Sequence, residues 1–263
     1  MIDKKEFLLQ YIIKAYIEHL EPIGSTQLKS MYDITYSPAT IRGYFKKLGE
    51  EGYLAQEHIS SGRTPTTEAL KQYWQSKLNL KLKGLNLRAL EYFASEIGLS
   101  VFIKKEKSDV LKNILNVEKR YMILEFSSFA ISVKYSDALY RFLNDMIGLD
   151  LKDITRISKD VGAYEVYESI NQTLQNSDFQ IFNYKEFLNL ALNYDFDEYT
   201  INSFLKGQIL DELKEGLYFD KLLPADYIGI CNYCKIDNEE VKMLVIGELP
   251  KDYEYFYEKI TTF

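Results

Sequence analysis

The sequence predicts an α+β protein in which an N-terminal winged helix-turn-helix is followed by a second α+β domain with a helical insertion. Two observations support this fold class. The first 75 residues read as a helix, a short helix, a third helix, a strand and a glycine-containing loop. The remainder carries strand-like runs near both of its ends and helix-like sequence between them. We therefore expect a first domain at residues 1–80, a linker at 81–87 and a second domain at 88–263.

The first two helices are predicted from the spacing of apolar residues. Leu8, Ile12 and Ala15 lie at helical intervals within residues 4–20, and "EPIG" ends this run with a proline and a glycine. Ser25 can cap a second, short helix, "TQLKSMYD". A helix, a break and a short helix are the first parts of a helix-turn-helix.

The third helix is expected to begin at Ser37, a good N-cap, with Pro38 in its first turn. At 100° per residue, its buried face holds Ile41, Phe45 and Leu48. The opposite face then carries small and basic residues: Ala39, Gly43 and Lys46, with Arg42 and Lys47 at its edges. Such a face suits a DNA major groove, because small side chains allow close approach and basic ones reach phosphates and guanine edges. An ordinary solvated helix face is the alternative.

After the third helix, "YLAQEHI" alternates like a strand, and "SSGR" at residues 60–63 reads as a tight loop. Arg63 at a loop tip could enter the minor groove or grip the DNA backbone. A simple β-turn whose arginine faces water is the alternative. A fourth helix then runs to about residue 79, with Leu70, Tyr73 and Trp74 on one face.

The charge distribution bears on how tightly this first domain could bind nucleic acid. Residues 1–80 hold 10 Lys/Arg and 9 Asp/Glu, whereas residues 81–263 hold 22 and 30, so the acidity of the chain belongs to the second part. A nearly neutral module should bind DNA weakly alone, because sequence-independent affinity comes from neutralised phosphates. We therefore expect a homodimer that reads both halves of a two-fold site.

The second domain has its own strand and helix signals. Residues 88–98 look helical, residues 121–125 and 129–134 look like two strands, and "DYIGICNYCKI" with "EVKMLVIGEL" looks like a hairpin. The helix "KDYEYFYEKI" follows, and residues 137–150 and 160–223 are mostly helix-like. No apolar run reaches the roughly 20 residues of a membrane span, and "MIDKKEFLLQ" lacks signal-peptide features, so we expect a cytoplasmic protein without a membrane partner.

The residues give little support for catalysis or cofactor binding. Cys231 and Cys234 form a C-x-x-C, but a zinc site needs two more ligands, and the histidines are His19 and His58 in the first domain. Buried cysteines are the simplest interpretation, with redox and metal roles as alternatives. The acidic "DFDEYT" at 195–200 reads as solvated surface. Nucleotide-binding and hydrolase motifs are missing from the sequence. We expect no enzyme activity, no metal and no cofactor.

Three motifs, "YIEHLEPIGSTQL", "SPATIR" and "SSGRTPT", resemble the N-terminal signature of the HrcA heat-inducible transcription repressors. The resemblance is weaker beyond residue 75, in "FLNDMIGLDLKDI" and the β-rich "YIGI" and "VKMLVIGELP". It implies a winged helix that binds an inverted-repeat operator and represses chaperone operons of the groE and dnaK type. It also implies a GAF-like second domain, a helical dimerisation segment within about 150–215, and the chaperonin GroEL as the modulator that restores repressor after heat stress.

The resemblance carries over to individual positions. The expected DNA-binding residues are Ser25, Thr26, Ser37, Ala39, Thr40, Arg42, Gly43, Lys46, Lys47, Gly62 and Arg63. Members of the family usually have an asparagine where this chain has Gly43. Either the bare backbone approaches DNA more closely here, or an asparagine contact has been lost.

Two other function classes stay open at the level of sequence. One is a winged-helix regulator controlled by a small molecule bound within residues 88–263. The other is a winged helix that binds RNA or docks a protein and has no operator. For the GAF-like domain, a fold used for packing and dimerisation is the reading we favour over a ligand pocket.

Overall fold

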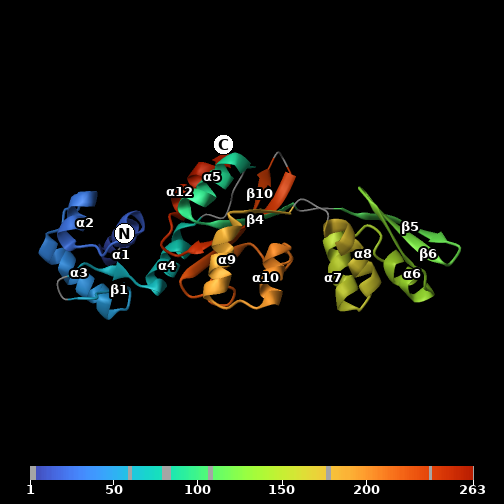
Figure 1. Cartoon of the computed structure of the whole chain (residues 1–263), viewed down its shortest axis with the longest axis horizontal. Coiled ribbons are helices and arrows are strands. Elements are labelled where there is room, and N and C mark those ends of the chain that lie inside the picture. The colour runs from blue at the N-terminus through green and yellow to red at the C-terminus, as the bar shows by residue number, and fades with distance from the viewer. Residues whose placement is uncertain are drawn as a thin grey trace. The chain divides into compact units, whose positions relative to one another are not determined.

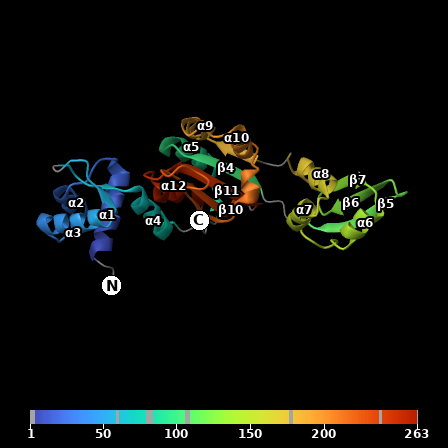
Figure 2. The same ribbon diagram turned by 90° about the horizontal axis from the view of Figure 1, so that it is seen from below.

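The computed structural model describes residues 4–58, 61–78, 84–105, 109–175, 179–236 and 239–262. The chain folds into two compact units: unit 1 combines Met1–Ile103 with Gln180–Phe263, and unit 2 is Lys104–Phe179. Figures 1 and 2 show the mixture of helices and strands in both units, so the α+β prediction is confirmed. Within the described ranges, every helix is too short or too polar to cross a lipid bilayer.

Unit 1 begins with three helices: α1 (Lys4–His19), α2 (Ser25–Tyr32) and α3 (Pro38–Glu50). Their predicted apolar faces are confirmed, since Leu8, Ile12 and Leu28 are fully buried in a common core. One detail of the prediction is wrong. The N-cap of α2 is Gly24, whose N–H donates to the Gln27 side chain (3.2 Å), and Ser25 is the first helical residue.

A short antiparallel hairpin follows α3. Strands β1 (Leu54–Ala55) and β2 (Thr64–Pro65) pair with each other, so "YLAQEHI" forms a much shorter strand than its alternation predicts. Arg63 is not at a free tip: its N–H and C=O both bond to Ile23 at 2.9 Å, which ties the loop to the segment between α1 and α2. A Cβ on Gly62 would lie 2.5 Å from the Pro22 backbone, so glycine is required for this close approach. Ser60 lies outside the described residues.

Helix α4 (Thr67–Lys77) has the face predicted for it, with Leu70, Tyr73 and Trp74 buried. Within the predicted linker, Gly84–Leu85 form strand β3 and Leu87 begins α5 (Leu87–Ile97), whereas residues 81–83 lie outside the described ranges. Gly84, which was predicted to lie in the linker, therefore belongs to a strand of the sheet of unit 1.

Among the described residues, the sheet of unit 1 has seven strands in the order β12-β3-β10-β11-β4-β8, with β9 also paired to β10. Its centre is the predicted hairpin, β10 (Tyr227–Ile236) and β11 (Glu239–Glu248), paired antiparallel over ten residues. The remaining strands are short or were not predicted: β4 (Ser100–Lys105), β8 (Phe179–Phe182), β9 (Gly216–Tyr218) and β12 (Thr261–Thr262). Strand β4 has no polar alternation that would reveal it, because its first four residues are all buried.

Helices pack on the sheet of unit 1 (Figure 1). Helices α5 and α12 (Tyr253–Ile260) contact each other and share a core with Ile228, Ile230 and Val245. Phe102 of β4 packs its ring against Phe187 of helix α9 (Tyr184–Asn193) and Phe204 of helix α10 (Glu198–Leu205). A short helix, α11 (Ile209–Glu212), follows.

Two buried polar side chains of the central hairpin have different surroundings. Lys242 is 5% exposed, and its ammonium donates to the carbonyls of Leu210 and Leu213 at the end of α11. Asn232 is fully buried, and neither its amide nitrogen nor its amide oxygen has a hydrogen-bond partner among the described residues. A buried amide without partners is destabilising.

Unit 2 is a three-stranded antiparallel sheet with helices on one face. The strands are β5 (Leu111–Val117), β6 (Tyr121–Phe126) and β7 (Ala130–Lys134), and the helices are α6 (Asp137–Asn144), α7 (Leu151–Asp160) and α8 (Tyr164–Gln175). Alternation along β6 and β7 buries Met122, Leu124 and Val133 against these helices. On the other face, Leu115 and Tyr121 are about half exposed. The two strands predicted at 121–134 are confirmed, and β5 was missed.

Asp109 holds the start of unit 2 together. Its buried carboxylate accepts hydrogen bonds from the N–H groups of Val110 (2.8 Å), Ser127 (2.6 Å) and Ser128 (3.0 Å), and from the Ser128 hydroxyl (2.6 Å). Burial by itself would raise the pKa of the carboxyl, but these hydrogen bonds outweigh it and hold the pKa of Asp109 below its ordinary value.

In sequence, unit 2 is an insertion between β4 and β8, which are neighbours in the sheet of unit 1. Because the two ends of the insertion leave adjacent strands, the sheet can form around it. The range 150–215, predicted as one helical segment, is divided between the units: α7 and α8 belong to unit 2, and α9 to α11 to unit 1. Its role in dimerisation stays a prediction.

Candidate nucleic-acid interface

The exposed face of α3 is the surface that the sequence predicted for DNA. Ile41, Phe45 and Leu48 are buried, as expected. The residues on the other side are all exposed: Ala39, Thr40, Arg42, Gly43, Lys46 and Lys47. We refer to these six residues as the α3 outer face.

The N-terminus of α3 is capped as predicted. The Ser37 hydroxyl accepts a hydrogen bond from the Thr40 N–H (3.1 Å) and lies 2.9 Å from the Thr40 hydroxyl. Pro38 occupies the first turn, where a missing N–H costs nothing. The Ile41 N–H donates to the Ser37 carbonyl (3.0 Å), so Ser37 closes the first turn of α3 with both its side chain and its backbone.

Arg42 connects α3 to the start of α2. Its Nη1 donates to the Ser25 hydroxyl at 3.3 Å, and Ser25 is only 9% exposed. This placement favours a role for Ser25 in holding the guanidinium of Arg42, and a direct contact between Ser25 and DNA stays a prediction. Thr26, the next residue of α2, is exposed.

The lysines of the α3 outer face are weakly held. Lys46 lies 3.8 Å from Glu50, and both side chains are largely exposed, so solvent screens this ion pair. The Lys47 ammonium lies 5.8 Å from the centre of the Tyr44 ring. Both ammonium groups can leave these partners for a phosphate at little cost.

The structure adds a cation that the sequence pattern did not single out. The Lys4 ammonium, at the start of α1, lies 5.7 Å from the ring centre of Tyr36, whose ring is 6.5 Å from that of Tyr44 on α3. Lys4 therefore joins the aromatic pair at the N-terminal side of α3. Because Lys4 is more than 30 positions before α3 in the sequence, no local pattern indicates that the two lie close together.

The described residues of the hairpin loop are held by hydrogen bonds. The Ser61 hydroxyl donates to the His58 carbonyl (2.7 Å) and accepts from the His58 N–H (3.1 Å). Gln56 Nε2 donates to the Ser61 carbonyl (3.0 Å). Arg63 is half-buried, and its backbone is fixed to Ile23. The loop is therefore attached to the same α1–α2 segment that leads into α2.

Gly43 lies in the middle of the α3 outer face, in open space. A Cβ at this position would meet nothing within 4 Å. Packing against the described residues therefore does not require a glycine here, and a partner that approaches the α3 outer face would.

The two cysteines are buried in the sheet of unit 1. Burial, with a smaller contribution from Cys231, raises the pKa of the Cys234 thiol to about 12. Because the thiolate is the form that reacts and binds metal, Cys234 is protonated and unreactive at neutral pH. Within the described part of the chain, acidic, histidine and cysteine residues do not gather into a group of three that could hold a metal ion.

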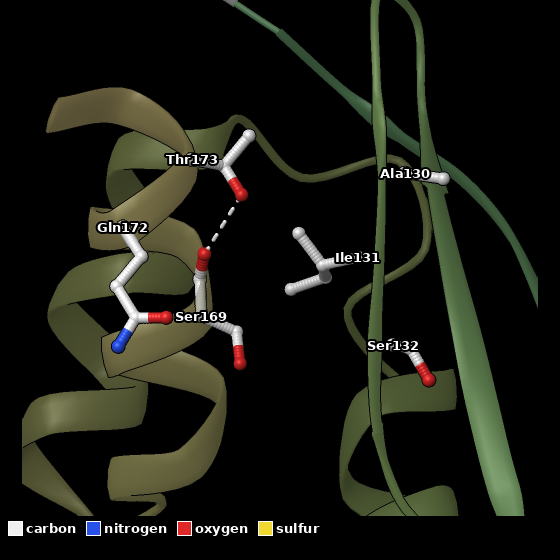
Figure 3. A pocket seen from close by; sticks show the side chains of 6 residues that line it. All are labelled: Ala130, Ile131, Ser132, Ser169, Gln172 and Thr173. Carbon is white, nitrogen blue, oxygen red and sulfur yellow. Dashed lines mark hydrogen bonds between the residues drawn. The ribbon is translucent and has the colours of Figure 1, made fainter. Parts of the chain in front are cut away.

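The structure has a hollow of about 440 Å³ in unit 2, between β7 and α8 (Figure 3). It is lined by Ala130, Ile131, Ser132, Ser169, Gln172 and Thr173. The Thr173 hydroxyl donates to the Ser169 carbonyl one turn earlier (2.9 Å) and is therefore already satisfied. A second hollow of about 540 Å³ lies beside α5 and includes Glu91 and Tyr92. Neither resembles the enclosed, mainly apolar cavity that small ligands usually occupy.

Comparison with known sequences gives a consistent result. The family described as "HrcA C-terminal domain" matches residues 74–263. A Helicobacter pylori protein named "Heat-inducible transcription repressor HrcA" is 32% identical over 264 residues, which covers 99% of this chain and 95% of that protein. A protein of the same name from Mycoplasma capricolum is 30% identical over 82% of this chain and 67% of its own length.

Among solved structures, one described as a hypothetical protein covers 98% of this chain and 96% of its own, with 18% sequence identity and a TM-score of 0.49. A TM-score below 0.5 does not establish a common arrangement of the whole chain.

Proposed function

The chain belongs to the HrcA family of heat-inducible transcription repressors, and from this premise we propose that it represses chaperone operons by binding an inverted-repeat operator as a homodimer. In this proposal α1 to α3 and the β1–β2 hairpin form a winged helix-turn-helix, and α3 enters the major groove. The sheet of unit 1, with α5 and α12, is the GAF-like part. The action is occupation of DNA, without chemistry.

The observation that carries this proposal is the α3 outer face. Its residues are small or basic, Arg42 is held by Ser25, and Lys46 and Lys47 have only weak partners. Arginine bound to guanine contributes about 1–3 kcal/mol of discrimination, whereas lysine on phosphate contributes affinity without sequence preference. Arg42 is therefore proposed to read a base, and the two lysines to bind the backbone.

We propose that unit 2 carries the contact between the two copies. Its helices α7 and α8 form the first part of the segment 150–215, and Val161 and Tyr164 near their junction are about 60% exposed. Leu115 and Tyr121 form a second exposed apolar pair on the sheet. The two pairs are replaced by aspartate in separate variants, and one of the two variants should be a monomer in sedimentation equilibrium. The pair whose replacement yields the monomer identifies the dimer surface.

The partner is tested by selection of bound sequences from random double-stranded DNA with the full chain. We expect a two-fold symmetric motif, bound much more tightly than one of its halves. An asymmetric motif would contradict the dimer. Competition by RNA as strong as by the selected DNA would favour the RNA-binding alternative.

Substitutions then test the proposed roles on the α3 outer face. Arg42→Ala should weaken binding by about 1–3 kcal/mol and relax the preference at one base pair. Lys46→Ala should weaken binding to all sequences equally and lower the salt dependence by about one unit per half-site. Lys14→Ala, an exposed cation on α1, is the matched control and should change neither.

Heat control is tested with the same DNA. The chain is heated, cooled with or without GroEL and ATP, and assayed for binding. Greater recovery with the chaperonin supports its proposed role as modulator, and equal recovery removes it from the account. A thermal-shift screen against metabolites tests the alternative of a ligand-controlled regulator, which a clear stabilisation by one compound would favour.

A further inference from the structure

Helix α4 joins two parts of unit 1 that are far apart in sequence. Ala69 and Leu70 belong to the core that α1 shares with the hairpin, and α4 contacts both α1 and β2. At its start, Thr66 caps the helix and also bonds to the Gly52 carbonyl (2.8 Å). Helix α4 is therefore attached to α1, to the hairpin and to the segment that follows α3.

The other side of α4 faces residues from the C-terminal part of unit 1. The Trp74 indole N–H donates to the Leu249 carbonyl at 2.7 Å, and its ring meets the ring of Tyr253 edge-on at 5.1 Å. The neighbouring Tyr73 hydroxyl donates to Glu254 at 3.2 Å. Trp74 is 1% exposed, so this contact is closed to water.

Polar contacts extend the same side toward the start of the helix. Lys71 forms an ion pair with Asp220 at 2.6 Å, and the Thr67 hydroxyl donates to Asp226 at 3.1 Å. Positions 67, 71 and 74 recur at the spacing of one helix face. Thr67, Lys71, Tyr73 and Trp74 thus contact five residues, Asp220, Asp226, Leu249, Tyr253 and Glu254, and we call this set of contacts the α4 seat.

The α4 seat is weaker than the sheet to which it belongs. It consists of the buried rings of Tyr73, Trp74 and Tyr253 with the Trp74 hydrogen bond, and of three polar contacts at a partly exposed edge, whereas β10 and β11 pair over ten residues with buried side chains on both faces. Contacts of this kind open locally at a lower cost than global unfolding.

We propose that the α4 seat is a heat-sensitive joint. When it opens, the three N-terminal helices and the hairpin lose their fixed placement, and DNA binding is lost before the sheet unfolds. This inference rests on the proposed DNA-binding function and adds the place at which heat acts on it. Closure of the joint keeps the two α3 helices of a dimer at the spacing of the two half-sites.

The single tryptophan of the chain lies in this joint and reports on it directly. The proposed experiment follows three signals on heating: Trp74 emission, circular dichroism at 222 nm, and anisotropy of a labelled DNA obtained by the selection above. A seat variant, Thr67→Val/Lys71→Met/Tyr73→Phe, removes the polar contacts while it keeps the side-chain volumes and Trp74. The matched control, Glu68→Gln/Gln72→Ala/Gln75→Ala, changes three exposed positions of the same helix.

In the wild-type chain, we expect the red shift of Trp74 emission and the loss of DNA binding to coincide below the main dichroism transition. In the seat variant both midpoints should fall together by about 4 °C or more, while the main transition moves less, and the control should match the wild type. The proposal is overturned if the Trp74 midpoint falls and DNA binding does not follow. It is also overturned if DNA is released while Trp74 stays buried. A wild-type chain that binds no DNA at any temperature would instead refute the proposed function. The two failures are distinguishable because the opening of the α4 seat is followed by Trp74 emission, which needs no DNA.

Discussion

Replacing Gly43 by alanine should stabilise unit 1, although it changes the centre of the proposed DNA-reading surface. Gly43 lies inside α3 with helical backbone, and its Cβ would meet no atom within 4 Å, so the substitution introduces no clash. Glycine inside a helix costs about 0.8–1.0 kcal/mol relative to alanine. We therefore expect a gain of about 1 kcal/mol, or about 2–4 °C in the melting temperature.

The assay is urea unfolding followed by Trp74 fluorescence and by circular dichroism, with Gly62→Ala as the contrasting variant. At Gly62 the added Cβ would lie 2.5 Å from the Pro22 backbone, so the same substitution should destabilise by about 1–3 kcal/mol. Opposite signs at the two glycines are the predicted outcome. A loss of stability in Gly43→Ala would refute the reasoning, because it would mean that this face is not open.

The same position distinguishes two ways of reading DNA. If the bare backbone approaches the groove floor, Gly43→Asn should weaken binding to the selected DNA. If an asparagine contact has been lost, Gly43→Asn should tighten binding. Because Ala39 and Lys46 flank this position on the same face, the effect should appear at base pairs under the middle of α3.

The remaining predictions concern buried polar groups. Asp109→Asn should destabilise unit 2 by about 2 kcal/mol at neutral pH. Because the pKa of Asp109 is lowered in the folded chain, the wild type should hold this stability above about pH 4 and lose it as the pH falls toward the folded pKa, which a pH series of urea unfolding measures. Asn232→Leu should raise the free energy of unfolding by about 1–2 kcal/mol, since it removes two buried polar atoms without partners; a decrease would show that a bound water satisfies them. Lys242→Met should lower it by about 1.5–3 kcal/mol because a buried carbonyl, that of Leu210, and a partly buried one, that of Leu213, lose their donor, whereas the exposed Lys235→Met should have little effect, as thermal unfolding would show.

Elements with local periodicity could be predicted from the sequence. The three N-terminal helices, α4, α5, α12, the β6–β7 strands and the β10–β11 hairpin could all be predicted, because apolar spacing and capping residues act within a few positions. The exposed face of α3 followed from the same spacing. Strand β4 was missed because its first four residues are buried, which removes the alternation that marks a strand.

Other features depended on residues that are distant in sequence. Gly62 is required by the backbone of Pro22, Arg42 is held by Ser25, and Trp74 lies against Tyr253. The limits of unit 2 depend on the pairing of β4 with β8. Thus the amino-acid sequence by itself determined the family, the N-terminal helices and the face of α3, because these follow from local patterns and motifs. Only the tertiary structure decided that Gly62 is required by close packing and that Gly43 lies in open space. The difference depends on the atoms that the fold brings near each glycine.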